Sequence, residues 1–387
     1  MKHILPYITL LITSLLTVGC RGSRDNDSVR YTTPEYIPQY ATGFKISGAE
    51  GRKSVMLEIS NPWQGANSVV TRLFIARNRE KAPAGFDGEV LDGGEVLRIV
   101  AMSSTHMAML DAIGEIKRVV GVSGIDYISN PYIQKHRDTV GDVGYEGNVN
   151  YERLLALAPD LVLLYGINGA SSMESRLKDL GIPYMYVGDY LEEHPLGKAE
   201  WIVAIAEIAG VRESGVSRFS EISEKYNRLK EHISQHLDGP QSAPRPNVMI
   251  NTPYGDTWFM PSAQSYMATL ISDAGGIYVY DRDNGNASLP IDIETAFMLT
   301  AGADKWINTG SETSIAGLKN NFPKFADTKP VVTNEVYNNT LRSTASGGND
   351  FYESGIVNPH LILQDLIRIF HPGVDSGTDL TYYRQLK

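Results

Sequence analysis

The sequence lacks the residue patterns that common catalytic mechanisms require. It contains no HExxH motif, no GxSxG motif, no P-loop and no SxxK motif accompanied by its partner motifs. The only cysteine, Cys20, follows an apolar N-terminal run and is expected to carry a lipid, which leaves no thiol for nucleophilic chemistry. We therefore expect that the protein is not an enzyme.

Histidine and carboxylate side chains form no recognisable metal-binding motif. A zinc or manganese site needs three or four converging histidines or carboxylates. The eight histidines include His3 in the N-terminal run and His232 and His236 on a predicted helix, and no loop is rich in histidine. His106 is a candidate ligand contact at the end of a predicted strand, although capping a helix is its more ordinary role. No resident metal is expected.

Two glutamates occupy equivalent places in two similar stretches of sequence. In NYERLLALAPDLVLLY, Asn150 is a helix cap and Glu152 follows two residues later; in DIETAFMLTAGADKWIN, Asp292 and Glu294 repeat this plan. Each glutamate is therefore expected in the first turn of a helix that precedes a strand. Such a residue ordinarily complements the helix dipole, for about 0.3 to 1 kcal/mol. One like charge in each half also fits two basic sockets on a symmetric partner.

Several aromatic residues are expected where an α/β protein binds its ligand, near the carboxyl ends of parallel strands. Five of them follow predicted strands or lie in the adjoining loops: Tyr127, Tyr145, Tyr165, Trp258 and Tyr337. An aromatic ring there offers a flat apolar face together with a polar atom. The chain has 21 tyrosines, so any single one could instead cover the core with its hydroxyl in water. As a set, these residues are expected to line a ligand site.

The elements that must position these residues predict a two-lobed α/β protein. With 387 residues, 42% of them hydrophobic, the chain exceeds one ordinary core and suits two. Beyond residue 96, apolar strands alternate with helices, as in parallel sheets, and a stripe of apolar residues after Trp201 predicts a long helix between the lobes. The predicted parts are a β-rich addition over 41–95, an N-terminal α/β lobe over 96–195, an interlobe helical segment over 196–240 and a C-terminal α/β lobe over 241–387.

The first forty residues predict export and lipid attachment. Lys2 precedes an apolar run of about 15 residues, and Gly19 stands before Cys20. This run is shorter than the roughly 20 residues that span a bilayer. Residues 1–20 are therefore interpreted as a lipoprotein signal peptide of bacterial type, with Cys20 as the lipidated residue. The polar stretch 21–40 is predicted to be a tether.

Several segments resemble the helical-backbone, or class III, periplasmic solute-binding proteins of ABC importers for ferric siderophores, haem and cobalamin. The segments are IVAMSSTHMAMLDAIG, VVGVSGIDYISNP, VGDVGYEGNVNYERLLALAPDLVLL, LGIPYMYVG, SLPIDIETAF and GGNDFYESGIVNPHLILQDLIRIFHPG. The resemblance covers roughly Val96 to Gly373. It implies two α/β lobes with central, mainly parallel sheets, joined by a rigid helix that permits only small closing movements.

The resemblance also implies roles for particular residues. In that family, one glutamate of each lobe contacts arginines of the permease dimer, a role that carries over to Glu152 and Glu294. Ligand contacts are implied in the loop that holds Arg342 and Tyr352, where Arg342 could pair with an anionic chelate. A first-strand histidine such as His106 is also where bare-metal binding proteins carry a ligand, and related two-lobed architectures include chelatases.

Together these observations predict a monomeric lipoprotein on the periplasmic side of a bacterial cell envelope. It would capture a small-molecule metal chelate, a ferric siderophore or haem, without a resident cofactor. Its expected partners are the ABC permease dimer, the chelate and the membrane through its lipid anchor. The net charge of -10, with scattered basic residues, argues against nucleic acid. Cobalamin, bare zinc or manganese, and a chelatase-like activity remain the alternatives.

Overall fold

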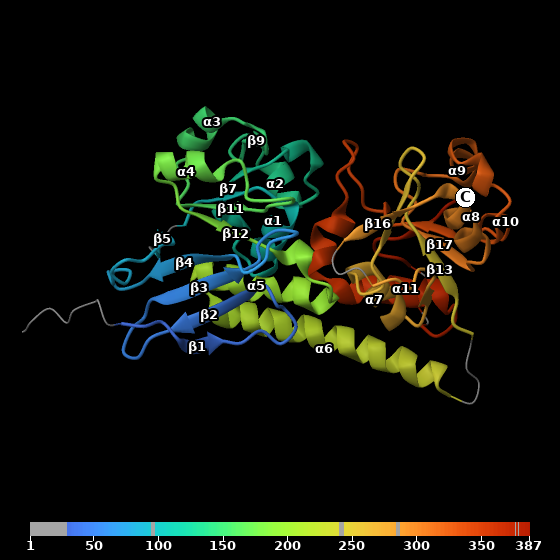
Figure 1. The fold of residues 1–387 in the computed structure, drawn as a ribbon, viewed down its shortest axis with the longest axis horizontal. Helices are drawn as coiled ribbons and strands as arrows, with labels where there is room; N and C mark the ends of the chain where they lie inside the picture. Colours follow the sequence, from blue (N-terminus) through green and yellow to red (C-terminus); the bar gives the residue numbers. More distant parts are fainter. Residues whose placement is uncertain (1–28, 94–96, 240–243, 284–286, 376, 378) are drawn as a thin grey trace, which may run out of the picture.

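The computed structural model describes residues 29–93, 97–239, 244–283, 287–375, 377 and 379–387. These residues form an N-terminal sheet and two α/β lobes side by side, joined by a long helix that runs beneath both (Figure 1). The fold class expected from the sequence is confirmed. Cys20, the signal peptide and the first part of the tether lie outside the described residues. Within the described part, none of the helices has both the length and the apolar composition needed to cross a bilayer.

The N-terminal lobe is built on a parallel sheet whose strands, apart from one edge strand, are short apolar runs. The strand order is β12 (Tyr184–Tyr186), β11 (Leu161–Leu164), β6 (Ile99–Ala101), β7 (Val119–Val122) and β8 (Gly141–Asp142). Continuous apolar strands of this kind are typical of a sheet that is covered on both faces. The helices of this lobe are α1 (Ser104–Ala112), α2 (Pro131–Lys135), α3 (Tyr151–Ala156) and α4 (Glu174–Leu180).

The C-terminal lobe repeats this plan with one reversed strand. Its sheet has the order β15 (Ile277–Tyr278), β13 (Asn247–Ile250), β17 (Lys305–Ile307), β18 (Val336–Asn338) and β19 (Arg384–Gln385). Only the pairing of β19 with β18 is antiparallel among the described strands of this sheet. A separate antiparallel pair joins β14 (Trp258–Pro261) to β16 (Ser288–Ile291). The helices are α7 (Tyr266–Asp273), α8 (Ile293–Ala301), α9 (Ile315–Asn321), α10 (Lys329–Val332) and α11 (Pro359–Phe370).

Two consecutive helices connect the lobes. Helix α5 (Pro195–Ala209) is buried along its whole length and ends at Gly210, which adopts the left-handed conformation (φ 76°) that glycine tolerates best. Helix α6 (Arg212–Leu237) has 26 residues, which corresponds to about 39 Å at 1.5 Å per residue. It buries one apolar stripe and passes under both lobes (Figure 1). The predicted long interlobe helix is therefore present.

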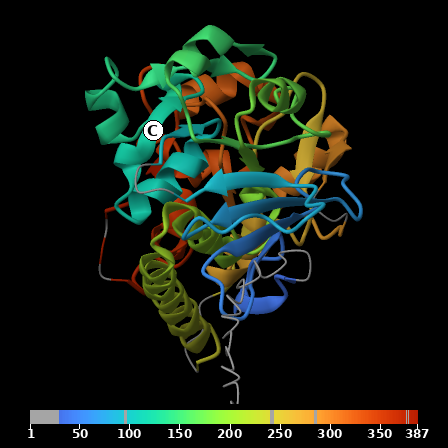
Figure 2. The ribbon, with the colours of Figure 1, turned by 90° about the vertical axis from the view of Figure 1, so that its left-hand side faces the viewer.

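The N-terminal sheet begins earlier than residue 41, the start that the sequence predicted for the β-rich addition. It comprises β1 (Thr33–Tyr36), β2 (Phe44–Gly48), β3 (Val55–Ser60), β4 (Val70–Ala76) and β5 (Glu89–Asp92), in that spatial order. Figure 2 shows this sheet below the N-terminal lobe and beside α6. Strand β1 falls within the predicted tether 21–40. The polar, proline-containing sequence gave no strand signal, but Pro34 is compatible with an edge strand.

A buried carboxylate fastens the start of this sheet to α5. Glu200 is fully buried, and its Oε1 accepts hydrogen bonds from the Tyr36 hydroxyl (2.6 Å) and the Gln39 N–H (2.7 Å). Its Oε2 accepts from the N–H groups of Tyr40 and Ala41, each at 2.7 Å. Three of the four donors belong to the predicted tether, and the fourth, Ala41, is the first residue of the predicted β-rich addition. The second half of that stretch is therefore fixed to the body of the protein.

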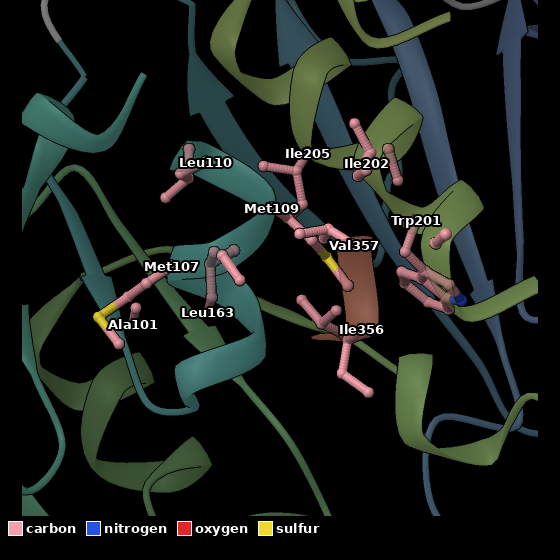
Figure 3. Close-up of a cluster of buried hydrophobic side chains, with 14 of the residues drawn as sticks. Ala101, Met107, Met109, Leu110, Leu163, Trp201, Ile202, Ile205, Ile356 and Val357 are labelled. Carbon is pink, nitrogen blue, oxygen red and sulfur yellow. The ribbon is translucent and has the colours of Figure 1, made fainter. Parts of the chain in front are cut away.

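The C-terminal lobe also inserts a short segment into the N-terminal one. The 3-10 helix η7 (Ser354–Val357) packs on both α1 and α5. Figure 3 shows Ile356 and Val357 of this segment between Met109 of α1 and the side chains of α5. These residues belong to one continuous apolar cluster that extends across both lobes. The lobes therefore share part of their core.

Candidate ligand-binding site

A cavity of about 980 Å³ lies between the two lobes. This is near the upper end of the usual range for small-molecule sites, about 300 to 1,000 Å³. The C-terminal lobe supplies most of its walls, from the loops that follow β13, β17 and β18. The lining residues are Ser104, Tyr127, Asn251, Thr252, Phe259, Asn308, Gly310, Ser311, Thr313, Asn339, Thr340, Ser343, Thr344, Ala345, Gly347, Gly348, Asn349, Tyr352 and Arg384. Most of these side chains are amides or hydroxyls, which donate and accept hydrogen bonds.

Aromatic rings from both lobes line this cavity. Tyr127, just before the loop Ile128–Ser129, and Tyr352, near the C-terminal lobe's η7, are 51% and 53% exposed. Phe259 of β14 contributes a third exposed ring. Tyr145 is not part of the lining, but its ring packs edge-on against Tyr127 with the ring centres 6.3 Å apart. Exposed rings of this kind are available to a flat or bulky ligand.

Three of the predicted aromatic contacts lie elsewhere in the structure. Trp258 is fully buried, and its Nε1 donates to the Ile250 carbonyl (3.0 Å). It lies in β14, which folds back after the end of β13, so its ring enters the core. Tyr337 lies within β18, and its hydroxyl donates to Glu335 (3.2 Å). Tyr165 follows β11 as expected but packs, half-buried, on the core of the N-terminal lobe.

Arg342 and His106 also lie outside the lining of the cavity. The Nε of Arg342 is 3.0 Å from Asp350 Oδ2, and its guanidinium lies over the ring of Tyr382. His106 is fully buried in α1, and burial lowers the pKa of its imidazole to about 3. The side chain is therefore neutral at physiological pH and faces the core. In the described part of the chain, no three His, Cys, Asp or Glu side chains gather in a way that could hold a metal ion.

The sequence reasoning missed the asparagines that form the wall of the C-terminal lobe. Asn251 directly follows β13 and Asn308 directly follows β17, and both adopt positive φ angles, 67° and 57°. Asparagine is among the few residues that tolerate this left-handed conformation. An asparagine immediately after each apolar strand, as in VMIN and KWIN, is a signal that could have located these two loops.

The two lobes touch beside the cavity. A Cβ atom on Gly348, in a loop of the C-terminal lobe, would overlap the backbone carbonyl of Tyr127 in the N-terminal lobe. Nearby, the buried carboxylate of Glu353 accepts a hydrogen bond from the Ser129 N–H (2.8 Å). Burial raises the pKa of Glu353 to about 7. These contacts join the C-terminal lobe to Tyr127 and to the loop that follows it.

The two first-turn glutamates have the local structure that the sequence predicted. Asn150 caps α3 by accepting from the Arg153 N–H (2.9 Å), and Asp292 caps α8 by accepting from the Thr295 N–H (2.6 Å). Glu152 is the acidic residue in the first turn of α3, and Glu294 that of α8. Both helices lie above the sheet of their lobe in Figure 1, on the side away from α6. Each lobe therefore presents one acidic helix start.

The resemblance between α3 and α8 extends to the neighbouring side chains. Residues 151–156 and 293–298 have the same order of exposed and buried positions. In both helices, apolar residues one turn after the glutamate stay exposed: Leu155 is 47% exposed, and Met298 is 70% exposed. Glu294 is 3.5 Å from Lys324, an exposed and therefore weak ion pair. Two similar surfaces, each with a carboxylate beside apolar groups, thus lie on the two lobes.

Comparisons with known proteins agree with this architecture. The sequence profile of the periplasmic binding protein family matches residues 99–340. An uncharacterized lipoprotein of Methanocaldococcus jannaschii is 24% identical over 97% of this chain and 94% of its own length. A periplasmic haem-binding protein from Pseudomonas aeruginosa aligns with 75% of this chain and 98% of its own, at 17% identity and a TM-score of 0.57. An Fe³⁺-hydroxamate transport protein from Saccharomonospora viridis aligns with 71% of this chain and 93% of its own, at 14% identity and a TM-score of 0.53. At these identities, the solved structures show a shared fold.

Proposed function

This chain belongs to the family of periplasmic binding proteins, and from that premise we propose that it captures an iron chelate, a ferric siderophore or a haem, for import. Membership of the family makes it an extracytoplasmic substrate-binding protein of an ABC importer, with a permease and a small ligand as partners. It also confirms the expectation that the protein binds its ligand without converting it. The nature of the ligand and the residues that bind it are our proposals.

The interlobe cavity is the observation that carries the proposal. Its volume of about 980 Å³ suits a ligand of several hundred daltons rather than a bare ion. Tyr127 and Tyr352 offer rings for a flat ligand, and a tyrosine phenolate is one of the side chains that hold haem iron in proteins. The amide and hydroxyl wall suits the oxygen atoms at the edge of a chelate. The haem- and hydroxamate-related structures of similar fold point in the same direction.

A titration of the purified protein lacking residues 1–20 tests this proposal. Haemin, a ferric siderophore, cobalamin, and free zinc and manganese are added in turn, and binding is followed by aromatic fluorescence and by the rise in melting temperature. We expect an iron chelate to bind with micromolar or tighter affinity. Tyr127→Ala or Tyr352→Ala should weaken this binding, whereas Tyr165→Ala, at a half-buried residue outside the cavity lining, should leave it unchanged. Binding of cobalamin alone or of a free metal alone would replace the proposal by that alternative.

We also propose that Glu152 and Glu294 dock the protein onto the permease dimer. Their exposure, their like charge and their matching positions on the two lobes support this role. Reversal of both charges to lysine should abolish uptake of the radiolabelled chelate by cells while leaving chelate affinity intact. Glu231→Lys, on an exposed face of α6, is the matched control. Lost affinity, or normal uptake by the double variant, would contradict the assignment.

Attachment to the membrane through Cys20 is a further proposal, which the lipoprotein relative supports. Labelled fatty acid should be incorporated into the full chain and not into Cys20→Ala. A Cys20→Ala protein that is still labelled would place the lipid elsewhere.

A further inference from the structure

Arg384 is the charged residue of the cavity wall. Among the described residues that line the cavity, it alone carries a formal charge. It lies in β19, where it pairs with Asn338 of β18. Its Nε is buried and has no hydrogen-bond partner in the described part of the chain. No described carboxylate lies within the 4.0 Å of its guanidinium that an ion pair requires, in contrast to Arg342, which is paired with Asp350.

A second donor at the same end of the cavity also lacks a partner. Thr340 lines the cavity, and its hydroxyl is buried without a hydrogen bond among the described residues. The backbone keeps it close to Arg384, because the next residue, Leu341, donates its N–H to the carbonyl of Tyr382 (3.1 Å). Buried polar groups are nearly always paired, and leaving a charged donor unpaired costs more than leaving a neutral one. An acceptor that reaches this end of the cavity would therefore supply the partner that both groups lack.

We infer that the ligand of this cavity carries an anionic oxygen, from a carboxylate or a catecholate, that accepts hydrogen bonds from Arg384 and Thr340. A planar guanidinium is the side chain best suited to such oxygens. The inference rests on the proposed function and narrows it to anionic chelates. In a protein of net charge -10, a cation in the cavity wall offsets the repulsion that an anionic ligand would meet. Arg384 lies beyond residues 99–340, so the family match does not assign it.

Titration with chelates of different charge tests the inference. The probes are haemin, with two carboxylates, a ferric tris-catecholate of charge −3, a neutral ferric tris-hydroxamate, and metal-free citrate. Arg384→Gln should weaken binding of an anionic chelate by about tenfold to a hundredfold, the usual worth of a hydrogen bond to a charged group, and leave the neutral chelate within about twofold. Arg384→Lys should lose less, because it keeps the charge but not the planar fork.

Further variants separate a direct contact from a structural role. Thr340→Val should weaken the same anionic probe to a smaller extent, and Arg228→Gln on the exposed face of α6 should change nothing. If Arg384→Gln weakens the binding of haemin alone, the anionic oxygen belongs to a carboxylate. If it weakens the binding of the tris-catecholate alone, the oxygen belongs to a catecholate. Equal losses for neutral and anionic chelates, no loss for either, or a wild type that binds only the neutral chelate would overturn the inference.

Failure of the proposed function gives a different pattern. In that case no iron chelate binds, but metal-free citrate still raises the melting temperature of the wild type and not of Arg384→Gln. If citrate does not raise the melting temperature of the wild type either, the inference of an anion site at Arg384 is also refuted. Circular dichroism spectra and ligand-free melting temperatures of the variants must match those of the wild type.

Discussion

Glu200 offers the sharpest test of how the N-terminal sheet is attached. Each of its two carboxylate oxygens accepts two hydrogen bonds from the segment that enters the sheet. In Glu200→Gln the NH₂ group is best placed toward Tyr36 and Gln39, where it can donate to the Tyr36 hydroxyl oxygen but cannot accept from the Gln39 N–H. One of the four hydrogen bonds is therefore lost, and the other three no longer involve a charged group. The side chain has no exposed surface, so water cannot replace the lost bond.

The size of the effect follows from the number of bonds. A hydrogen bond to a charged group contributes about 1.5 to 3 kcal/mol, so losing one should lower the free energy of unfolding by about that amount, and weakening the other three adds to the loss. That is a substantial part of the 5 to 15 kcal/mol that typically stabilises a protein. Tyr36→Phe should cost less, because the carboxylate keeps its charge and its three backbone donors.

Two assays measure this effect. Urea unfolding followed by tryptophan fluorescence gives the free energy, and hydrogen exchange at the amides of Gln39, Tyr40 and Ala41 reports the segment itself. Glu50→Gln, at an exposed turn between β2 and β3, is the control and should change the free energy by less than about 0.5 kcal/mol. A loss below about 1 kcal/mol in Glu200→Gln, with unchanged exchange at the three amides, would refute the reasoning.

Three further predictions concern buried groups and the contact between lobes. The pKa of Glu353 is raised to about 7, so this carboxyl takes up a proton on folding and stability should fall as the pH rises from about 4.5 to 7; Glu353→Gln should flatten this fall in melting temperature. The pKa of His106 is lowered to about 3, so stability should decrease as the pH drops below about 6.5. His106→Leu should remove this decrease, raise the melting temperature and leave chelate affinity unchanged. A loss of chelate affinity in this variant would show that His106 belongs to the ligand site. Gly348→Ala should push away the loop of Tyr127 and weaken chelate binding severalfold in the titration, whereas Gly302→Ala, where a Cβ meets only ordinary contacts, should not.

The sequence predicted those parts of the molecule that follow from local pattern. Runs such as LVLL became buried parallel strands, and apolar spacings of three and four became α6. The caps Asn150 and Asp292 and the glutamates two residues later took their expected places, because capping depends on a few neighbouring residues. The extent of the N-terminal sheet was underestimated, since the bonds that fix its first residues come from Glu200, far away in the sequence.

The cavity wall was harder to predict because it consists mostly of loops. Strand ends indicate where a loop starts but not the direction in which the chain continues, so Trp258 entered the core while Phe259 faces the cavity. The conformations of Asn251 and Asn308 depend on single left-handed residues. Arg384 lies on a strand of two residues, too short to give a periodic pattern, and only the pairing of β19 with β18 brings it to the cavity.

The insertion of η7 between α1 and α5 has a consequence for the order of events during secretion. Met109 and its neighbours cross the membrane before the side chains that complete their packing, Ile356 and Val357, which come much later in the chain. The packing around Met109 is therefore completed only after this segment has crossed. We expect that a polypeptide truncated before residue 354, which lacks this packing, is more sensitive to proteases than the full chain.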